Sequence, residues 1–185
     1  MQRNARLTQA AWNSIEPTLQ RIFAIEHVSI KEYMILCSKV QEYCRDQTDN
    51  GRLVGVGRAH VIYAALKQFL QKFVSQKAEK IRALPLAEDR LLEYRSTWEN
   101  YVFSAKITNG TFRYLNQHWV KRHNESLTPL ELATGRKAFD ADVLCMVIWK
   151  EEMFTKIETN VTKAALELLE ADRNKERGVR MDLVK

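Results

Sequence analysis

The chain has 185 residues, of which 45% are apolar and 28% charged, a composition typical of a soluble globular domain with a real core. Its net charge of +6 admits a nucleic-acid partner, but 29 basic residues are offset by 23 acidic ones and the two signs alternate along most of the chain. The apolar runs are far shorter than the roughly 20 residues of a membrane span, and the opening residues MQRNARLTQAAW lack the apolar core of a secretory signal. We therefore expect a soluble intracellular protein that does not bind membranes.

Few helix breakers are present, with 6 glycines and 3 prolines in the whole chain, so we expect long helices. Apolar residues recur at helical spacing after Trp12 and predict a first helix that begins at Gln9 or Ala10, with Thr8 as its N-cap. Pro17 lies inside this pattern and should either kink the helix or mark its true first turn.

Ser29 and Glu32 have the spacing of a capping box, which predicts a second helix from Ile30 to about Arg45 or Asp46. One face of this helix would supply the core, and its residues are Ile30, Ile35 or Leu36, Val40 and Tyr43. A second face is also poor in charge, and its residues are Tyr33, Met34, Cys37 and Gln41.

Further helices are expected beyond a glycine-containing loop at residues 47–58. A broad apolar stripe over 61–74 predicts a third helix that ends before Leu84, and a fourth should begin near Pro85. A fifth is expected from about Ser104 to Val120, where Gly110 lowers helix propensity and would allow another helix to pack closely.

The last part of the chain should contain an irregular stretch at 123–140 and two more helices, at 142–153 and 161–170. Because no alternating β pattern of useful length occurs, the predicted class is all-α, an elongated multi-helix bundle. We expect this bundle to cover residues 1–175, followed by a loosely anchored tail or the start of a second repeat at 176–185.

Residues for catalysis or metal binding do not form a recognisable pattern. The motifs GxSxG, HExxH and the P-loop are missing, and LVGVGRA lacks the third glycine of a phosphate-binding fingerprint. The four histidines are scattered, none at a ligand spacing found in structural zinc sites, and they are His27, His60, His118 and His123. We expect no enzyme activity, no cofactor and no metal.

The second and fifth predicted helices carry more apolar surface than one core-facing stripe requires. The fifth adds Tyr114, Leu115, His118, Trp119 and Val120 to this excess. Such helices are either buried on all sides or bind a partner through the extra face, and periodicity allows both. Tyrosine, tryptophan and methionine are common at protein interfaces, so a docking surface is one of the two interpretations.

At these helices the sequence resembles the first repeat of the cullins. Residues 98–122, WENYVFSAKITNGTFRYLNQHWVKR, follow the cullin pattern WxxYxFSxKxxNGxxxYLNxHWVxR. Further matching stretches are ALKQFLQKFV at 65–74, VIWKEEMF at 147–154 and VTKAALELLEADRN at 161–174. The pattern is most similar to the cullins of Skp–cullin–F-box ubiquitin ligases.

This resemblance implies a non-catalytic scaffold that binds a Skp-type adaptor, and through it an F-box substrate receptor, in the cytoplasm and nucleus. The RING subunit of such a ligase would bind only through a C-terminal region that these 185 residues do not contain. Carried over by position, the adaptor surface comprises Tyr33, Met34, Cys37, Gln41, Leu115, Asn116, Trp119 and Arg122.

Cys37 and Gln41 depart from the family pattern, which often has tyrosine at both positions, and the stretch 124–140 looks longer than usual. Losing two aromatic anchors would weaken adaptor binding or change the choice of adaptor. The alternative function is a basic helical module that binds nucleic acid through Lys121, Arg122 and the basic residues between 175 and 180.

Overall fold

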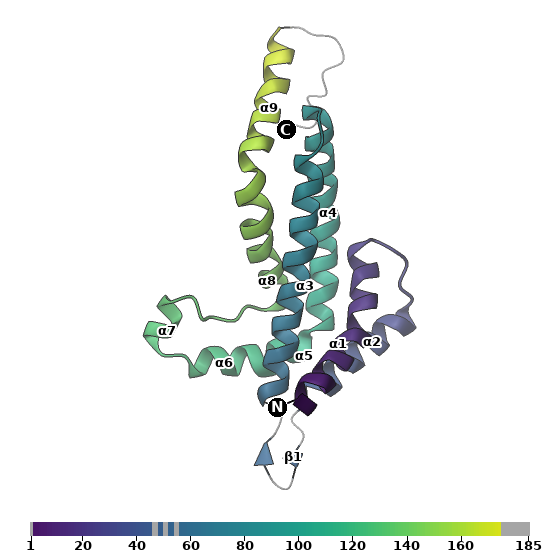
Figure 1. The fold of residues 1–185 in the computed structure, drawn as a ribbon, viewed down its shortest axis with the longest axis vertical. Coiled ribbons are helices and arrows are strands. Elements are labelled where there is room, and N and C mark those ends of the chain that lie inside the picture. The colour runs from purple at the N-terminus through teal and green to yellow at the C-terminus, as the bar shows by residue number, and fades with distance from the viewer. Residues whose placement is uncertain (1, 46–47, 50–51, 54–55, 175–185) are drawn as a thin grey trace. The chain divides into compact units, whose positions relative to one another are not determined.

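The computed structural model describes residues 2–45, 48–49, 52–53 and 56–174, and Figure 1 shows their helical architecture. The longer helices are α1 (Gln2–Phe23), α2 (Ile30–Cys44), α3 (Val56–Arg82), α4 (Ala87–Thr111), α8 (Ala141–Ile148) and α9 (Thr155–Arg173). Shorter ones are α5 (Arg113–Leu115), α6 (Lys121–Ser126), α7 (Pro129–Ala133) and the π-helices η1 (Asn116–Val120) and η2 (Trp149–Phe154). The predicted all-α class is confirmed.

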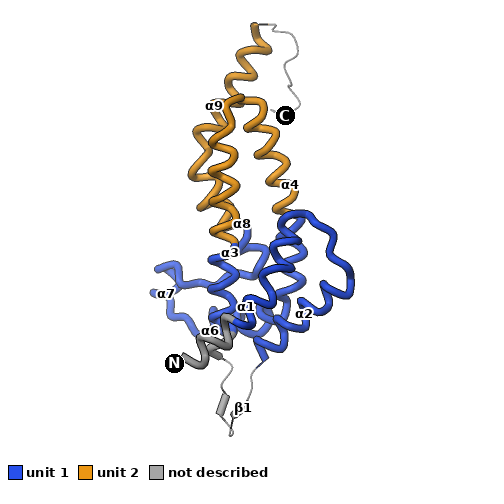
Figure 2. The backbone as a smooth tube through the Cα atoms, turned by 45° about the vertical axis from the view of Figure 1, so that its right-hand side comes forward, with its two compact units in different colours: residues 1–69, 103–145 blue, residues 70–102, 146–185 orange. Residues whose placement is uncertain are grey.

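Two compact units divide the chain (Figure 2). Unit 1 comprises residues 1–69 and 103–145, and unit 2 comprises residues 70–102 and 146–185. Helices α3 and α4 each contribute residues to both units. The assignment of residues 1–175 to one helical bundle stays a prediction, and the expected tail at 176–185 lies outside the described residues.

The core of unit 1 contains the apolar stripe of α1, as the periodicity predicts. Trp12 and Phe23 contact the ring of Phe69 in edge-to-face geometry, with centroid distances of 6.1 and 5.5 Å. Helix α1 nevertheless begins at Gln2, well before the predicted N-cap Thr8, and continues through Pro17. No glycine or proline precedes Thr8 in the sequence, so nothing there ends the helix.

The start of α2 is fixed by the predicted capping box. Ser29 Oγ accepts a hydrogen bond from the Glu32 backbone N–H, and Glu32 Oε2 accepts one from the Ser29 backbone N–H. Arg21 of α1 donates to Glu32 Oε1 at 2.5 Å, and with the Ser29 bonds it lowers the pKa of this carboxyl to about 2. The ionised carboxylate therefore ties the end of α1 to the start of α2 at neutral pH.

The fifth helix begins nine residues later than predicted, because α4 continues through Ser104 to Thr111. Ser104 is buried and does not cap a helix: its Oγ donates to the Ile22 carbonyl at 3.0 Å. The chain leaves the α conformation at Phe112, whose φ and ψ are −95° and 15°, and whose side chain is fully buried. A new helical segment, α5–η1–α6, then starts at Arg113.

Three other boundaries differ from the predictions. The expected loop at 47–58 contains a two-residue antiparallel pair, β1 (Thr48–Asp49) and β2 (Arg52–Leu53), and α3 already begins at Val56. The expected irregular stretch at 123–140 contains the end of α6 and the short helix α7, which starts with a Thr128–Glu131 capping box and Pro129 at its first turn. Helices α8, η2 and α9 follow one another without a break, so residues 154–160 are helical.

Unit 2 has an aromatic core around Trp149 of η2. The rings of Tyr94, Trp98 and Tyr101 lie 4.9 to 5.8 Å from it, and Tyr101 also stacks on Phe73. Ser75 of α3 donates a hydrogen bond to Glu152 of η2 at 2.7 Å. These contacts join α3, α4 and η2 within this unit.

Candidate protein-binding surface

Helix α2 packs against α5 within unit 1, so the structure brings together the two segments that carry excess apolar surface. Along α2, the side chain of Met34 is 57% exposed, Gln41 is exposed, and Tyr33 and Cys37 are half-buried. We call these four residues, together with Arg113, Tyr114 and Gln117 of α5 and η1, the α2/α5 surface. A hollow of about 280 Å³ lies within it, lined by Cys37, Gln41, Gly110, Thr111, Arg113, Tyr114 and Gln117.

Tyr33 fits against the backbone at Gly110, near the end of α4. A Cβ atom at Gly110 would lie 2.6 Å from the Tyr33 hydroxyl oxygen, closer than any real contact allows. Burial raises the pKa of Tyr33 above its usual range, and the neighbouring Cys37 thiol raises it further. The expected role of Gly110 in close packing is confirmed, and the neutral Tyr33 hydroxyl is held beside the hollow.

Replacing Gly110 with alanine is expected to force the Tyr33 ring to move. Alanine favours a helix by up to about 1 kcal/mol over glycine, but in the parent chain the clash with the hydroxyl oxygen offsets this gain. In a Tyr33→Phe background the nearest atom to the new Cβ is the ring carbon at 4.0 Å, so the gain should be recovered. Urea unfolding of the four variants in a double-mutant cycle measures this coupling, and additivity within about 0.3 kcal/mol would contradict it.

Trp119 of η1 is half-buried inside a cluster of rings. It stacks on His123 with a centroid distance of 4.9 Å and an interplanar angle of 15°, and it contacts Tyr63 at 4.9 Å and His60 at 6.0 Å. The Tyr63 hydroxyl accepts a hydrogen bond from the Phe139 backbone N–H at 2.9 Å, and burial raises the pKa of Tyr63. Part of the Trp119 ring is therefore used inside the fold, and the rest is available at the surface.

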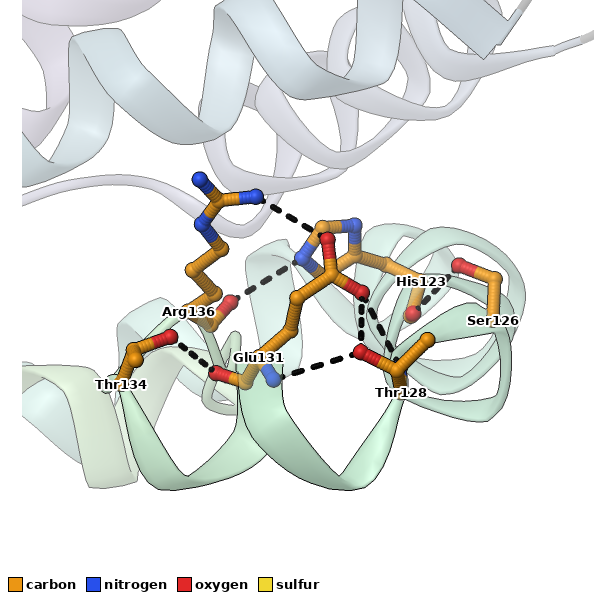
Figure 3. A network of polar contacts seen from close by, with 6 residues as sticks. All are labelled: His123, Ser126, Thr128, Glu131, Thr134 and Arg136. Atoms are coloured by element: carbon orange, nitrogen blue, oxygen red, sulfur yellow. Dashed lines mark hydrogen bonds and ion pairs between the residues drawn. The ribbon is translucent and has the colours of Figure 1, made fainter.

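The segment after α6 is attached to the same cluster through His123 (Figure 3). His123 Nε2 donates to the Arg136 carbonyl at 3.2 Å, and the Arg136 guanidinium forms an ion pair with Glu131 at 3.0 Å. Glu131 in turn accepts hydrogen bonds from Thr128, and together with Arg136 these bonds lower the pKa of the Glu131 carboxyl. The stretch that looked unusually long is thus held to α6 by hydrogen bonds.

Leu115 and Asn116, both assigned to the adaptor surface, have contacts inside the fold. Leu115 is 0% exposed and belongs to the core of unit 1, so its assignment to direct contact with a partner is corrected. Asn116 is half-buried: its Nδ2 donates to Asn109 Oδ1 at 2.6 Å, and its Oδ1 accepts from the Ala141 backbone N–H at 3.2 Å. Asn116 thus joins α4, η1 and the start of α8.

A second correction concerns Ile30, which the pattern placed on the core face of α2 and which is 84% exposed. Val40 of that face is buried, and of the alternatives Ile35 and Leu36, Leu36 is buried and Ile35 is 45% exposed. Ile30 lies at the first position of α2, next to the α1–α2 connection, where periodicity alone does not tell whether a neighbour covers it.

The predicted basic residues lie at the surface. Arg122 is exposed, with its Nε bonded to the His118 carbonyl at 2.7 Å, and Lys121 is exposed beside it.

Sequence reasoning also missed residues that line the hollow, namely Thr111, Arg113 and Gln117. Arg113 and Gln117 follow Gly110 at three and seven positions, the spacing of one helix face, so the close packing expected at Gly110 was the signal that could have found them. In the described part of the chain, no group of three or more His, Cys, Asp or Glu side chains is placed to hold a metal ion. No helix of the described residues combines the length and apolar content needed to cross a membrane.

Comparison with known proteins identifies the family of this chain. Residues 12–185 match the family model for the cullin alpha solenoid domain. The chain belongs to the cullin family. It is 28% identical over 184 residues to Cullin-1 of Caenorhabditis elegans, an alignment that covers 90% of this chain and 22% of that protein.

Two further relatives show a similar degree of identity. Identity to Cullin-1 of Dictyostelium discoideum is 27% over 155 residues, covering 78% of this cullin chain and 19% of the relative. Identity to Cell division control protein 53 of Saccharomyces cerevisiae is 25% over 170 residues, covering 79% and 19% respectively. The chain therefore spans about a fifth of the length of the curated relatives it matches.

Proposed function

We propose that this cullin chain is the adaptor-binding scaffold module of a cullin–RING ubiquitin ligase, active in the cytoplasm and nucleus. It holds a Skp-type adaptor, and through it an F-box substrate receptor, on the α2/α5 surface. The observation that supports this most directly is the exposed Met34 beside Tyr33, Cys37 and Gln41, on a helix that packs against α5. The RING subunit would bind a region of the ligase outside these 185 residues.

The chemistry of the surface suits a protein partner. An interface of standard size buries roughly 1,600 Å² in total, with large apolar and aromatic side chains at its centre and polar residues at the rim. Met34 and the exposed part of Trp119 would supply such anchors. Arg113, which lines the hollow, and Lys121 are exposed, and their charge would speed the encounter with an acidic adaptor.

The small side chain at Cys37 gives the surface a distinctive shape. Where other cullins often present tyrosines, Cys37 and Gln41 border the hollow of about 280 Å³. We infer that the adaptor of this cullin fills the hollow with a side chain of its own, which would favour an adaptor with a bulky residue there. The function requires no catalytic group in this chain, because the module serves only as a rigid support that holds the adaptor in position.

Met34→Asp is expected to reduce the affinity for a purified Skp-type adaptor by roughly 100-fold, about 3 kcal/mol, because the substitution removes an apolar anchor and places an unpaired charge in the interface. Isothermal titration calorimetry measures the affinity. Ile35→Asp is the matched control: Ile35 is adjacent on α2 and 45% exposed, but it lies one residue, about 100°, around the helix. Equal affinities for the parent and the Met34→Asp variant would refute this use of the surface.

The nucleic-acid alternative has less support. Lys121 and Arg122 are exposed, but the basic residues between 175 and 180 lie outside the described residues. Binding of that kind would weaken steeply with added salt, because it releases counterions from the phosphate backbone.

A further inference from the structure

A second hollow lies at the start of α2, and we propose that the adaptor also inserts apolar side chains there, next to a basic residue of its own. The inference rests on the proposed function, because it assigns a second contact to the same partner. The hollow has a volume of about 610 Å³, and the residues that line it include Ile22, Ile25, Ile30, Tyr33, Phe103 and Ile107. We call it the α1–α2 groove.

Three large apolar side chains are exposed around the groove. Ile30 is 84% exposed, Phe103 55% and Ile25 44%, and the three come from α2, α4 and the α1–α2 connection. Single exposed apolar residues are common, but several gathered around one concave site mark interaction surfaces. Covering any of these three side chains would contribute favourable free energy of association, because burial of apolar area is its main favourable term.

Backbone strain at Ile25 supports a role for this side chain. The end of α1 forms a Schellman motif, with Glu26 N–H bonded to the Arg21 carbonyl and Ile25 N–H to the Ile22 carbonyl. Ile25 occupies the left-handed position of this motif, with φ of 58°, where glycine is usual and a β-branched residue is strained. The fold keeps an isoleucine at a site that favours glycine, and the side chain lines the groove.

The groove is continuous with the α2/α5 surface. Ile30 precedes Tyr33 by three residues and Met34 by four, so the three lie on one side of α2. Tyr33 lines the groove and also lies beside Gly110 and Cys37, two residues that line the neighbouring hollow. Because one helical turn rises only about 5 Å, an adaptor that covers Met34 can contact Ile30 with the same part of its surface.

The charge at the groove specifies the chemistry of the inserted segment. Glu26 is the acidic residue that lines it, and its side chain is 60% exposed. Arg21, the partner of Glu26 at 3.7 Å, binds Glu32 much more closely, at 2.5 Å. The Glu26 carboxylate is therefore only loosely paired, and a lysine or arginine beside the apolar side chains of the adaptor would complement it.

The test measures adaptor affinity by calorimetry, with the adaptor alone and with its F-box receptor present. Ile30→Ser and Phe103→Ser are each expected to weaken binding of the adaptor alone by roughly 5- to 20-fold, since each removes one large apolar contact. Ile35→Ser is the matched control, because Ile35 is exposed on the same helix but does not line the groove, and it should change the affinity less than about twofold.

Two further variants examine strain and charge. Ile25→Gly should weaken binding several-fold while the melting temperature stays equal to or above that of the parent, because glycine relieves the left-handed backbone. Glu26→Lys should weaken binding more at low salt than at high salt, because added salt screens exposed charges. A fall in melting temperature together with affinity in Ile25→Gly would count against the inference.

The outcomes separate the two proposals. Failure of the parent chain to bind the adaptor would overturn both. Tight binding by the parent that is lost in Met34→Asp, yet unchanged in Ile30→Ser and Phe103→Ser, would overturn the groove alone. A loss that appears only when the receptor is present, or a change in the oligomeric state of Ile30→Ser without a change in affinity, would assign the groove to another occupant and overturn the adaptor as its ligand.

Discussion

Leu115→Ala is expected to lower the free energy of unfolding by about 2–5 kcal/mol, the usual cost of a large-to-small substitution in a well-packed core. Leu115 is 0% exposed at the end of α5, immediately before the π-helix η1. Removing its side chain leaves a cavity beneath the segment that carries Trp119 and faces α2. Binding of the adaptor should weaken as well, because α5 loses its support.

Chemical denaturation of purified parent and variant chains measures this effect. Leu115→Met is the control, because a swap that nearly conserves volume costs less than about 1.5 kcal/mol and leaves no large cavity. A Leu115→Ala chain as stable as the parent but unable to bind the adaptor would show that Leu115 contacts the partner directly. That result would restore the assignment made from sequence.

The assignment of Leu115 was carried over by position from the family pattern, whereas the local geometry of this chain places its side chain in the core. In an α-helix, positions 115 and 119 are four apart and share a face, so both look like members of one surface stripe. The structure has a π-helix at Asn116–Val120, in which hydrogen bonds join residues five apart. Leu115 and Val120, also five apart, are both buried, while Trp119 turns partly outward. The sequence of this stretch does not predict a π-helix, so the position carried over from the family pattern could not be checked against the periodicity.

Features set by local chemistry were predicted well. The Ser29–Glu32 capping box fixes the start of α2, and the apolar stripe of α1 packs as its spacing requires. Both depend on neighbours a few positions apart in the sequence. The start of a helix at Ser104 was wrong because serine favours N-caps, whereas this serine is buried and bonded to the Ile22 carbonyl, 82 positions away in the chain.

The exposed face of α2 also could not be predicted from its own residues. Its pattern offers two faces that could each be core, and the structure buries Leu36 and Val40 but leaves Ile30 and Met34 outside. Which apolar face stays uncovered depends on how α1, α4 and α5 pack around it, information that one helix does not contain. The excess of apolar residues on α2 was a sound signal of exposed apolar surface, although the sequence assigned Ile30 to the wrong side.

Trp119→Ala is expected to lower the free energy of unfolding by about 2 kcal/mol, in addition to weakening adaptor binding. A fully buried tryptophan costs about 3–5 kcal/mol when truncated, and Trp119 is only half-buried. Its ring packs between His123 and Tyr63, and these two residues bond to the backbone of Arg136 and Phe139. Loss of the indole should therefore loosen the connection from α6 to α8.

Hydrogen exchange shows which part of the fold loses stability in the Trp119→Ala chain. The backbone N–H of Phe139, bonded to the Tyr63 hydroxyl, should exchange faster in Trp119→Ala than in the parent, whereas amides in α9 should be unchanged. Trp119→Phe is the matched control, since it keeps an aromatic ring against His123 and Tyr63 and should protect Phe139 better than alanine does. Unchanged exchange at Phe139 in Trp119→Ala would mean that the indole serves the partner alone. The expected result instead gives this tryptophan a structural role in holding the α6–α8 connection, beside the adaptor contact proposed for its remaining surface.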